Sequence, residues 1–397
     1  MSRELLNRNS DLKRLRDEGY LVQIKGGLLL LRGVPYVNEA KQVRMGTLIS
    51  TLTLAGDLTQ LPDTHVVYFD GEPPCTADGV KIPIVHQSQD FNLGNEVVAK
   101  CSFSRKPEGG YKDYYEKMST YAAILSAPAE QLKPGANPRT LVAYEEGDDD
   151  CIFKYAETAS DRAGIGALAE RLSHERVAII GLGGTGAYIL DLVSKTPVRE
   201  IRLIDGDEFL THNAFRTPGA PSLEELRDAP KKVEYLKAIY SKMHRAVVAH
   251  AVYVNADNLH LLDGVTFAFI CIDGGGEKRL IIDCLETLGI PFIDVGMGLE
   301  LVDESLGGIL RVTASTPGKR DHIHSGKISF EAGGADDLYA SNIQVADLNS
   351  LNAALAVVKW KKIRGFYRDL EREHHCTYTT DGNITINSEQ NDEIPAP

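Results

Sequence analysis

The sequence of 397 residues lacks several features that would each indicate a particular class of protein. No apolar run approaches the roughly 20 residues that a membrane-spanning helix needs, and the first 20 residues resemble an amphipathic helix instead of a secretory signal. Basic residues are outnumbered, 43 Lys and Arg against 56 Asp and Glu, and the formal charge of −13 argues against electrostatic binding to nucleic acid or anionic lipid. We therefore expect a cytoplasmic protein whose partners are proteins or small molecules.

The cysteine content indicates neither a zinc knuckle nor a disulfide framework. Structural zinc sites need closely paired cysteines, and small disulfide-rich proteins carry cysteines densely. Here six are spread along the chain without a CxxC pair: Cys75, Cys101, Cys151, Cys271, Cys284 and Cys376. With 43% hydrophobic and 25% charged residues, the chain has the composition of an ordinary globular protein with room for two or three domains.

Residues 1–150 are predicted to form a separate α+β domain. After the opening helix, runs rich in β-branched and aromatic residues predict strands, and aromatic residues at helical spacing predict a helix over 111–125. The predicted strands are two within 20–34, joined at a Gly-Gly pair, and others at 43–52, 64–69 and within 83–103. Pro128, Pro134 and Pro138 and the acidic run at 145–150 then indicate a linker. Because no motif here indicates a chemistry, we expect a role in recognition or dimerisation.

From about residue 156 helices and strands alternate, which is typical of a parallel sheet covered by helices. We predict helices at 156–173, 186–194, 229–244, 278–288 and 350–371, the last interrupted by Gly365. Strands are predicted at 177–180, 201–204, 249–254, 266–271, 291–295 and 377–386, with short strands between 297 and 330. Residues 156–397 are therefore expected to form one α/β domain with a C-terminal lobe of helix and strand.

A glycine-rich loop follows the first of these strands. The segment VAIIGLGGTG runs from strand to glycine turn to helix, and Gly181, Gly183 and Gly186 fall on the GxGxxG spacing, with Gly184 between them. Such glycines let the backbone approach a phosphate, which then lies at the positive end of the helix dipole. Asp205 closes the next strand, where a carboxylate would accept hydrogen bonds from ribose hydroxyls. Nucleotide binding is predicted, and the loop alone permits either NAD or ATP.

The residues after the second strand favour ATP. The segment IDGDEFLTHNAFR places Asp207, Asn213 and Arg216 just beyond Asp205. A dinucleotide reductase has no use for an Asn and an Arg at this position. A triphosphate does need them, because its charge must be met by cations and amide donors while the α-phosphorus is attacked.

These motifs together resemble the ThiF, MoeB and ubiquitin-activating-enzyme family of adenylyltransferases, whose pattern is GxGGxG, then DxD, then Asn and Arg. The resemblance covers about residues 156–300 and implies a Rossmann-like ThiF adenylation fold, ATP and Mg²⁺. In that family a Lys opens the next helix, and Lys232 matches it better than Lys231. An Asp that ends a buried strand holds the metal, and Asp273 matches it.

Two further family positions match this sequence less closely. A basic residue is expected shortly after the metal-binding Asp, where Arg279 is the better candidate and Lys278 the weaker one, and Gly274 replaces the usual Asn. An Arg before the first strand often reaches the triphosphate of a dimer partner, and Arg162 is the candidate. The resemblance thus assigns a catalytic role to Arg162, Arg216, Lys232 and Asp273, and implies a homodimer.

The resemblance implies that a partner's terminal carboxylate attacks the α-phosphate of ATP to give an acyl-adenylate and pyrophosphate. The expected partner is a ubiquitin-like protein, with a ubiquitin-conjugating enzyme as recipient, in a bacterial ubiquitination-like pathway of the kind linked to antiviral defence. Activation of a sulfur-carrier protein is an alternative, and the net charge disfavours a tRNA-modifying activity. An NAD-dependent oxidoreductase and a non-catalytic scaffold are alternatives of other classes.

A thioester intermediate would need a nucleophilic cysteine. Residues 297–345 contain none, and Cys376, next to His374 and His375, is the candidate in the C-terminal part. The alternative is a turn residue ahead of the last predicted strand. His322 and His324 have HxH spacing, but no third ligand can be placed beside them.

Overall fold

The computed structural model describes residues 5–6, 8–139, 152–155, 165–330 and 343–390. They fall into two compact units, one before residue 140 and one from residue 152 onward. Among these described residues, no helix is both long enough and apolar enough to span a membrane.

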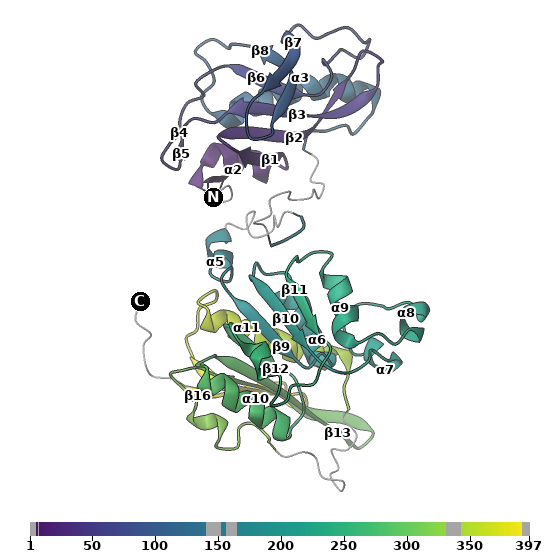
Figure 1. The fold of residues 1–397 in the computed structure, drawn as a ribbon, viewed down its shortest axis with the longest axis vertical. Helices are drawn as coiled ribbons and strands as arrows, with labels where there is room; N and C mark the ends of the chain where they lie inside the picture. Colours follow the sequence, from purple (N-terminus) through teal and green to yellow (C-terminus); the bar gives the residue numbers. More distant parts are fainter. Residues whose placement is uncertain (1–4, 7, 140–151, 156–164, 331–342, 391–397) are drawn as a thin grey trace. The chain divides into compact units, whose positions relative to one another are not determined.

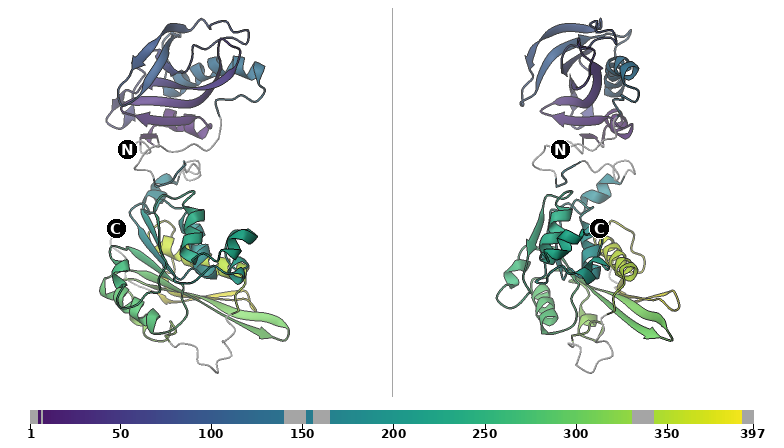
Figure 2. Two further views of the ribbon diagram at one scale, coloured as in Figure 1. Left: turned by 45° about the vertical axis from the view of Figure 1, so that its right-hand side comes forward. Right: turned by 90° about the vertical axis from the view of Figure 1, so that its right-hand side faces the viewer.

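In its described residues the first unit has a six-stranded antiparallel sheet together with the helices α2 and α3 (Figure 1). Its strand order is β1-β2-β3-β6-β8-β7. The strands are β1 (Leu21–Lys25), β2 (Leu28–Val37), β3 (Val43–Thr51), β6 (Val66–Asp70), β7 (Val85–Asn92) and β8 (Val98–Ser104), and β4 (Leu54–Ala55) pairs with β5 (Leu58–Thr59). The helices α2 (Ser10–Asp17) and α3 (Tyr114–Leu132) lie on one face of the sheet, where their apolar side chains join the main core of this unit (Figure 2). The predicted strands are confirmed.

Helix α3 extends beyond the prediction: Pro128 was expected in a linker, but it lies inside the helix, which continues to Leu132. A proline inside a helix lacks the N–H that would donate to residue 124 and costs about 3 kcal/mol. The neighbouring Leu125 and Ala129 are buried in the first unit. Burial of this helix face therefore offsets the missing hydrogen bond.

The second unit contains an eight-stranded sheet in the order β11-β10-β9-β12-β13-β14-β15-β16. The first five strands are parallel, and β14, β15 and β16 continue the sheet in antiparallel fashion. The parallel strands are β11 (Val247–His250), β10 (Glu200–Ile204), β9 (Arg176–Ile180), β12 (Phe267–Ile270) and β13 (Phe292–Val302). The antiparallel strands are β14 (Ser305–Ser315), β15 (Glu373–Thr379) and β16 (Ile384–Gln390). The predicted α/β class is thus confirmed.

Helices cover both faces of this sheet. On one face, α6 (Gly184–Val193), α9 (Lys232–Tyr240) and α11 (Ala346–Ile363) pack their apolar side chains against β9, β10, β12 and β13. On the other face, α10 (Gly276–Thr287) and η1 (Leu259–Leu262) pack against the alternate side chains of the same strands. The short helices α5 (Gly166–Glu170), α7 (Thr211–Ala214), α8 (Leu223–Arg227) and η2 (Asp321–Ile323) complete the unit. The carboxyl ends of the parallel strands meet at one edge, where α/β proteins bind ligands.

Several element boundaries differ from the predictions. The strand expected at 249–254 is β11 at Val247–His250, and the residues after it form a loop. Helix α11 ends at Ile363 because Gly365 takes a left-handed conformation with φ of 68° that stops the helix. The short strands expected between 297 and 330 are one long hairpin, β13 and β14, which extends from the body of the unit (Figure 2).

Candidate adenylation site

The glycine loop connects β9 to α6. Gly181 has φ of 87°, and a Cβ atom there would lie 2.6 Å from the carbonyl oxygen of Cys271. A Cβ atom on Gly186 would lie 2.0 Å from the carbonyl oxygen of Gly181. A Cβ atom on Gly183 would meet no atom within 4 Å. The first two glycines therefore permit the turn, and Gly183 faces open space that a ligand can fill.

Asp205 holds this loop in place. It follows β10, and one carboxylate oxygen accepts the N–H of Leu182 at 2.6 Å. The other oxygen accepts the N–H of Asp207 at 2.8 Å. The side chain thus ties the glycine loop to the turn after β10, a role that the sequence motif does not indicate. Each carboxylate oxygen has a further lone pair, so acceptance from a ribose hydroxyl stays compatible with this geometry.

Lys232 begins α9 and reaches the same region. Its Nζ atom lies 2.6 Å from Oδ2 of Asp207 and 3.8 Å from Oδ2 of Asp205, and the side chain is buried. Burial acts to raise the pKa of Asp207, but hydrogen bonds from Lys232 and Tyr253 lower it below its usual range. The neighbouring Lys231 points elsewhere, because its Nζ atom donates to the carbonyl oxygen of Gly206 at 2.9 Å.

Arg216 is positioned by the turn that contains Asn213. The side-chain oxygen of Asn213 accepts the N–H of Leu210 at 2.8 Å, and its backbone carbonyl accepts the N–H of Arg216 at 3.0 Å. Burial lowers the pKa of Arg216, while the nearby carboxylates of Asp273 and Asp207 act to raise it. The Nε atom of Arg216 is buried without a hydrogen-bond partner among the described residues. Asn213 therefore shapes the turn and does not line the cavity.

These segments surround one cavity of about 430 Å³ at the carboxyl edge of the parallel strands. Of the residues predicted from the sequence, those that line it are Gly181, Gly183, Gly184, Asp205, Asp207, Arg216, Lys232 and Asp273. The volume lies in the usual range for small-molecule sites. Cations, carboxylates and exposed glycine backbone at the start of a helix form a set that suits a nucleotide phosphate chain.

Magnesium fits the same residues. In the described parts of the chain, no group of three or more His, Cys, Asp and Glu side chains could hold a metal ion. Mg²⁺ is commonly held by one or two carboxylates together with substrate phosphates, so a single aspartate at the phosphate end of the cavity is enough. Asp273, which follows β12 and lines the cavity, meets this requirement.

Comparison with known proteins agrees with this geometry. Residues 158–314 match the ThiF family, and residues 10–158 match a domain of unknown function, DUF6791. Residues 158–314 are a ThiF family domain. The predictions of an adenylyltransferase family, a Rossmann-like fold and an extra N-terminal domain are thereby confirmed.

The chain is similar to E. coli MccB crystallised with ATP, at 18% identity and a TM-score of 0.45, over 57% of this chain and 67% of MccB. It is also similar to PaaA, at 18% identity and a TM-score of 0.41, over 57% of this chain and 76% of PaaA. No curated protein matches the sequence.

Helix α11 contributes to the ThiF site in a way that the motifs did not indicate. Oδ1 of Asn349 accepts from the hydroxyl of Thr185 at 2.9 Å, directly beside Gly184. Nδ2 of Asn352 donates to the carbonyl oxygen of Gly296 at 3.0 Å, and Asn352 lines the cavity. Both asparagines are fully buried. Two asparagines three residues apart, and therefore on one face of the helix, were the signal that could have indicated this wall.

The basic residue expected after Asp273 does not reach the cavity of the ThiF domain. Lys278 is buried and its Nζ atom lies 2.8 Å from the fully buried Asp294, whose other oxygen lies 2.6 Å from Arg311. Arg279 stacks on the ring of Phe330 at 4.4 Å. Lys278, the weaker candidate, is therefore the inward-facing one, and its role is to neutralise Asp294. Arg162 lies outside the described residues.

Cys376 lies within strand β15 of the ThiF unit, between Val312 on β14 and Asn387 on β16, and not in the turn weighed as its alternative setting. It does not line the cavity. Burial raises the pKa of its thiol, and burial lowers the pKa of His374 and His375 to about 4. Both histidines are therefore neutral at pH 7 and provide no positive charge to stabilise a thiolate. These observations weigh against a nucleophilic role for Cys376.

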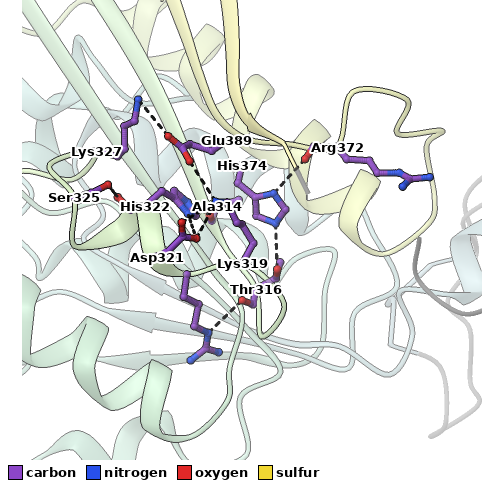
Figure 3. Close-up of polar contacts among 11 residues, drawn as sticks. Ala314, Thr316, Lys319, Asp321, His322, Ser325, Lys327, Arg372, His374 and Glu389 are labelled. Atoms are coloured by element: carbon purple, nitrogen blue, oxygen red, sulfur yellow. Dashed lines mark hydrogen bonds and ion pairs between the residues drawn. The ribbon is translucent and has the colours of Figure 1, made fainter. Parts of the chain in front are cut away.

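The HxH histidines point to different partners. Nε2 of His322 donates to the carbonyl oxygen of Ala314 at 2.8 Å, and the residue is buried beside His374 (Figure 3). His324 is partly exposed, and its Nε2 atom lies 2.9 Å from Glu286. The two rings therefore do not converge on a common ligand.

Proposed function

We propose that the ThiF domain uses ATP to adenylate the C-terminal carboxylate of a ubiquitin-like protein. One observation carries the proposal: Arg216, Lys232 and Asp273, which are far apart in the sequence, line one cavity together with the glycine loop. An enzyme that only binds NAD has no need for two cations and a further carboxylate at this place. A scaffold protein has no need for any of them.

The reaction follows from this set of groups. The triphosphate would lie along the glycine loop, at the N-terminal end of the ten-residue helix α6. An oxygen of the substrate carboxylate attacks the α-phosphorus, the bond from that phosphorus to the bridging oxygen breaks, and pyrophosphate leaves. Lys232 and Arg216 neutralise the charge that develops on the leaving group. Magnesium, when held by Asp273 and the phosphates, would add further positive charge at that end.

The identity of the carboxylate partner rests on the family resemblance. A protein C-terminus suits a chain whose formal charge of −13 disfavours nucleic acid, and a ubiquitin-like protein is the preferred partner over a sulfur carrier. The same proposal includes transfer to a ubiquitin-conjugating enzyme, in a bacterial pathway linked to antiviral defence. It also includes a homodimer in which Arg162 reaches the triphosphate of the partner subunit. Because Cys376 does not line the cavity and its neighbouring histidines carry no charge to stabilise a thiolate, we place the acyl-adenylate itself as the product of this chain.

ATP–pyrophosphate exchange tests the proposal. The purified protein is incubated with Mg²⁺, ATP, labelled pyrophosphate and a panel of ubiquitin-like and sulfur-carrier proteins. Asp273→Ala is the blank, and Asp283→Ala, on the exposed face of α10, is the matched control. Exchange that depends on one panel member and on Asp273 supports adenylation and identifies the partner. Absence of exchange with every partner, together with magnesium-independent binding of NAD, would overturn the proposal in favour of a reductase.

A further inference from the structure

The loop after β11 places an aromatic ring at the edge of the candidate ATP cavity. Tyr253 lines the cavity, yet its side chain is 65% exposed. A Cβ atom on Gly206 would lie 2.7 Å from Cε2 and 2.8 Å from Cδ2 of this ring. The tyrosine therefore packs directly on the bare backbone of Gly206, and much of the ring stays open to a ligand.

Hydrogen bonds hold both the hydroxyl and the backbone of Tyr253. The hydroxyl of Tyr253 donates to the Asp207 carboxylate, and its backbone carbonyl accepts from Nδ2 of Asn258 at 2.8 Å. The side-chain oxygen of Asn258 in turn accepts the N–H of Asn255 at 2.8 Å, which closes the loop on itself. An exposed aromatic residue would ordinarily sample several rotamers. These contacts fix the orientation of the ring before any ligand binds.

Both polar and apolar residues line the cavity. Arg216, Lys232 and the glycine loop suit phosphates. Ile204, Val254 and Ile281 line the cavity and belong to one hydrophobic cluster, and Tyr253 lies directly beside Val254 in the chain. Asp205, the candidate ribose-binding residue, directly follows Ile204. A nucleotide whose phosphates lie on the glycine loop and whose ribose reaches Asp205 therefore finds Ile204, Val254 and Tyr253 in the same cavity as contacts for its base.

We propose that Tyr253 is the base-stacking residue of this site and that it favours a purine nucleotide. This inference rests on the proposed function, because it takes ATP as the ligand. Every nucleobase has a flat π face, and stacking on an aromatic side chain stabilises binding without a specific hydrogen bond. The larger ring system of a purine covers more of the exposed tyrosine than a pyrimidine does.

The alternative is that Tyr253 acts only through its hydroxyl, by orienting Asp207. Two variants separate these roles. Tyr253→Phe keeps the ring and removes the hydroxyl, whereas Tyr253→Ala removes both. Tyr367→Ala is the matched control, because Tyr367 is also an exposed tyrosine of the second unit and does not line the cavity.

Calorimetric titration of the full chain with ATP, UTP and inorganic tripolyphosphate, each with Mg²⁺, tests the inference. Tyr253→Ala should weaken ATP binding by about 5- to 100-fold, the effect usual for loss of a base-stacking aromatic ring. Its affinity for tripolyphosphate, which has no base, should not change, and the wild-type preference for ATP over UTP should shrink. Tyr253→Phe and Tyr367→Ala should bind ATP as the wild type does.

Other results would overturn the inference. Stacking would be excluded if Tyr253→Ala bound ATP as tightly as the wild type does, or if it lost affinity for tripolyphosphate to the same extent as for ATP. Equal losses in Tyr253→Phe and Tyr253→Ala would assign the effect to the hydroxyl. In all three cases wild-type exchange activity would leave the proposed function standing. A wild-type protein that binds none of these triphosphates would instead overturn the proposed function.

Discussion

Lys232 and Asp207 form an ion pair of 2.6 Å inside the cavity, so the cation expected to meet the triphosphate already has an anionic partner. Tyr253 donates to the other oxygen of the same carboxylate. A triphosphate that binds Lys232 must therefore compete with Asp207. The affinity of the site reflects the difference between these two interactions and not the phosphate contact alone.

The first prediction concerns this competition. Asp207→Asn keeps an acceptor for Tyr253 and removes the negative charge, so tripolyphosphate should bind about two- to five-fold more tightly, as expected for a partly exposed ion pair. Titration calorimetry at fixed Mg²⁺ measures this, with Glu208→Gln as the control on the neighbouring exposed residue. Weaker binding in Asp207→Asn would mean that Asp207 contacts the ligand itself, as the sequence motif predicts.

The second prediction compares two glycines of the same loop. Gly186→Ala should destabilise the second unit, because the new methyl group would lie 2.0 Å from the carbonyl oxygen of Gly181. A Cβ atom on Gly183 would meet no atom within 4 Å, so Gly183→Ala should destabilise the unit less than Gly186→Ala does and should weaken ATP binding by occupying space that a phosphate would fill. Thermal unfolding and ATP titration of both variants test the pair. Normal stability in Gly186→Ala would contradict the packing described for the loop.

The third prediction concerns Lys117, which is buried in the first unit with its Nζ atom 2.8 Å from the hydroxyl of Ser50. Burial lowers its pKa from 10.5 to about 8. The folded state disfavours protonation of Lys117, so the free energy of unfolding should rise as the pH increases from 8 to 10.5. At pH 7 the buried charge costs about 3 kcal/mol, taking about 1.4 kcal/mol for each unit of pKa difference.

Lys117→Met should therefore raise the free energy of unfolding of the first unit by about 1–3 kcal/mol at pH 7, after loss of the Ser50 hydrogen bond is included. The gain should disappear near pH 10. Hydrogen exchange of the α3 amides reports on this unit, and Lys112→Met, at an exposed position, is the control. A stability difference that does not depend on pH would contradict the assignment to the buried charge.

The fourth prediction concerns His374 (Figure 3). This residue lies near the start of β15, which forms a hairpin with β16. His374 is buried, its Nδ1–H donates to the carbonyl oxygen of Arg372, and its Nε2 accepts from Thr316. Burial lowers its pKa from 6.5 to about 4, so the stability of the folded state is complete above pH 6.5 and is lost as the pH falls from 6.5 to 4. Full protonation would cost about 3 kcal/mol for this residue.

Amide exchange in β15 and β16 should therefore accelerate between pH 6.5 and pH 4, after correction for the intrinsic exchange rate. Glu389, on β16, is held by Lys319 and Lys327 and should be released together with the hairpin. His374→Gln should reduce the acid sensitivity, whereas a variant of the partly exposed His324 should not. An unchanged acid response in His374→Gln would assign the sensitivity to other groups.

The sequence predicted the parallel core of the second unit because its buried strands are continuous apolar runs and its glycine loop has a fixed spacing. It also predicted several residues of the cavity, since motif positions in such folds lie at the carboxyl ends of neighbouring strands. It did not indicate the second role of Asp205, whose hydrogen bonds go to backbone N–H groups that leave no trace in a residue pattern. The buried Lys117 could not be recognised either, because a lone lysine on a helix is usually exposed.

Asn349 and Asn352 were missed because they come from a segment more than 150 residues after the glycine loop, and only the tertiary fold brings Asn349 to Thr185 and Asn352 to the cavity. Tyr253 was missed for a similar reason. It lies in a loop that was predicted to be the end of a strand, and the loop conformation is set by Asn258. Long-range and loop contacts of this kind follow from the folded chain and not from local periodicity.

The contribution of α11 affects how this protein can be dissected. The family match ends at residue 314, and every motif residue identified from the sequence in the described part of the cavity lies before that point. The wall made by α11 begins at Ala346. A fragment that ends with the family match would keep all the recognisable motifs and lose Asn349, which braces the phosphate loop, and Asn352, which lines the cavity. Inactivity of such a fragment would therefore say nothing about the motifs themselves.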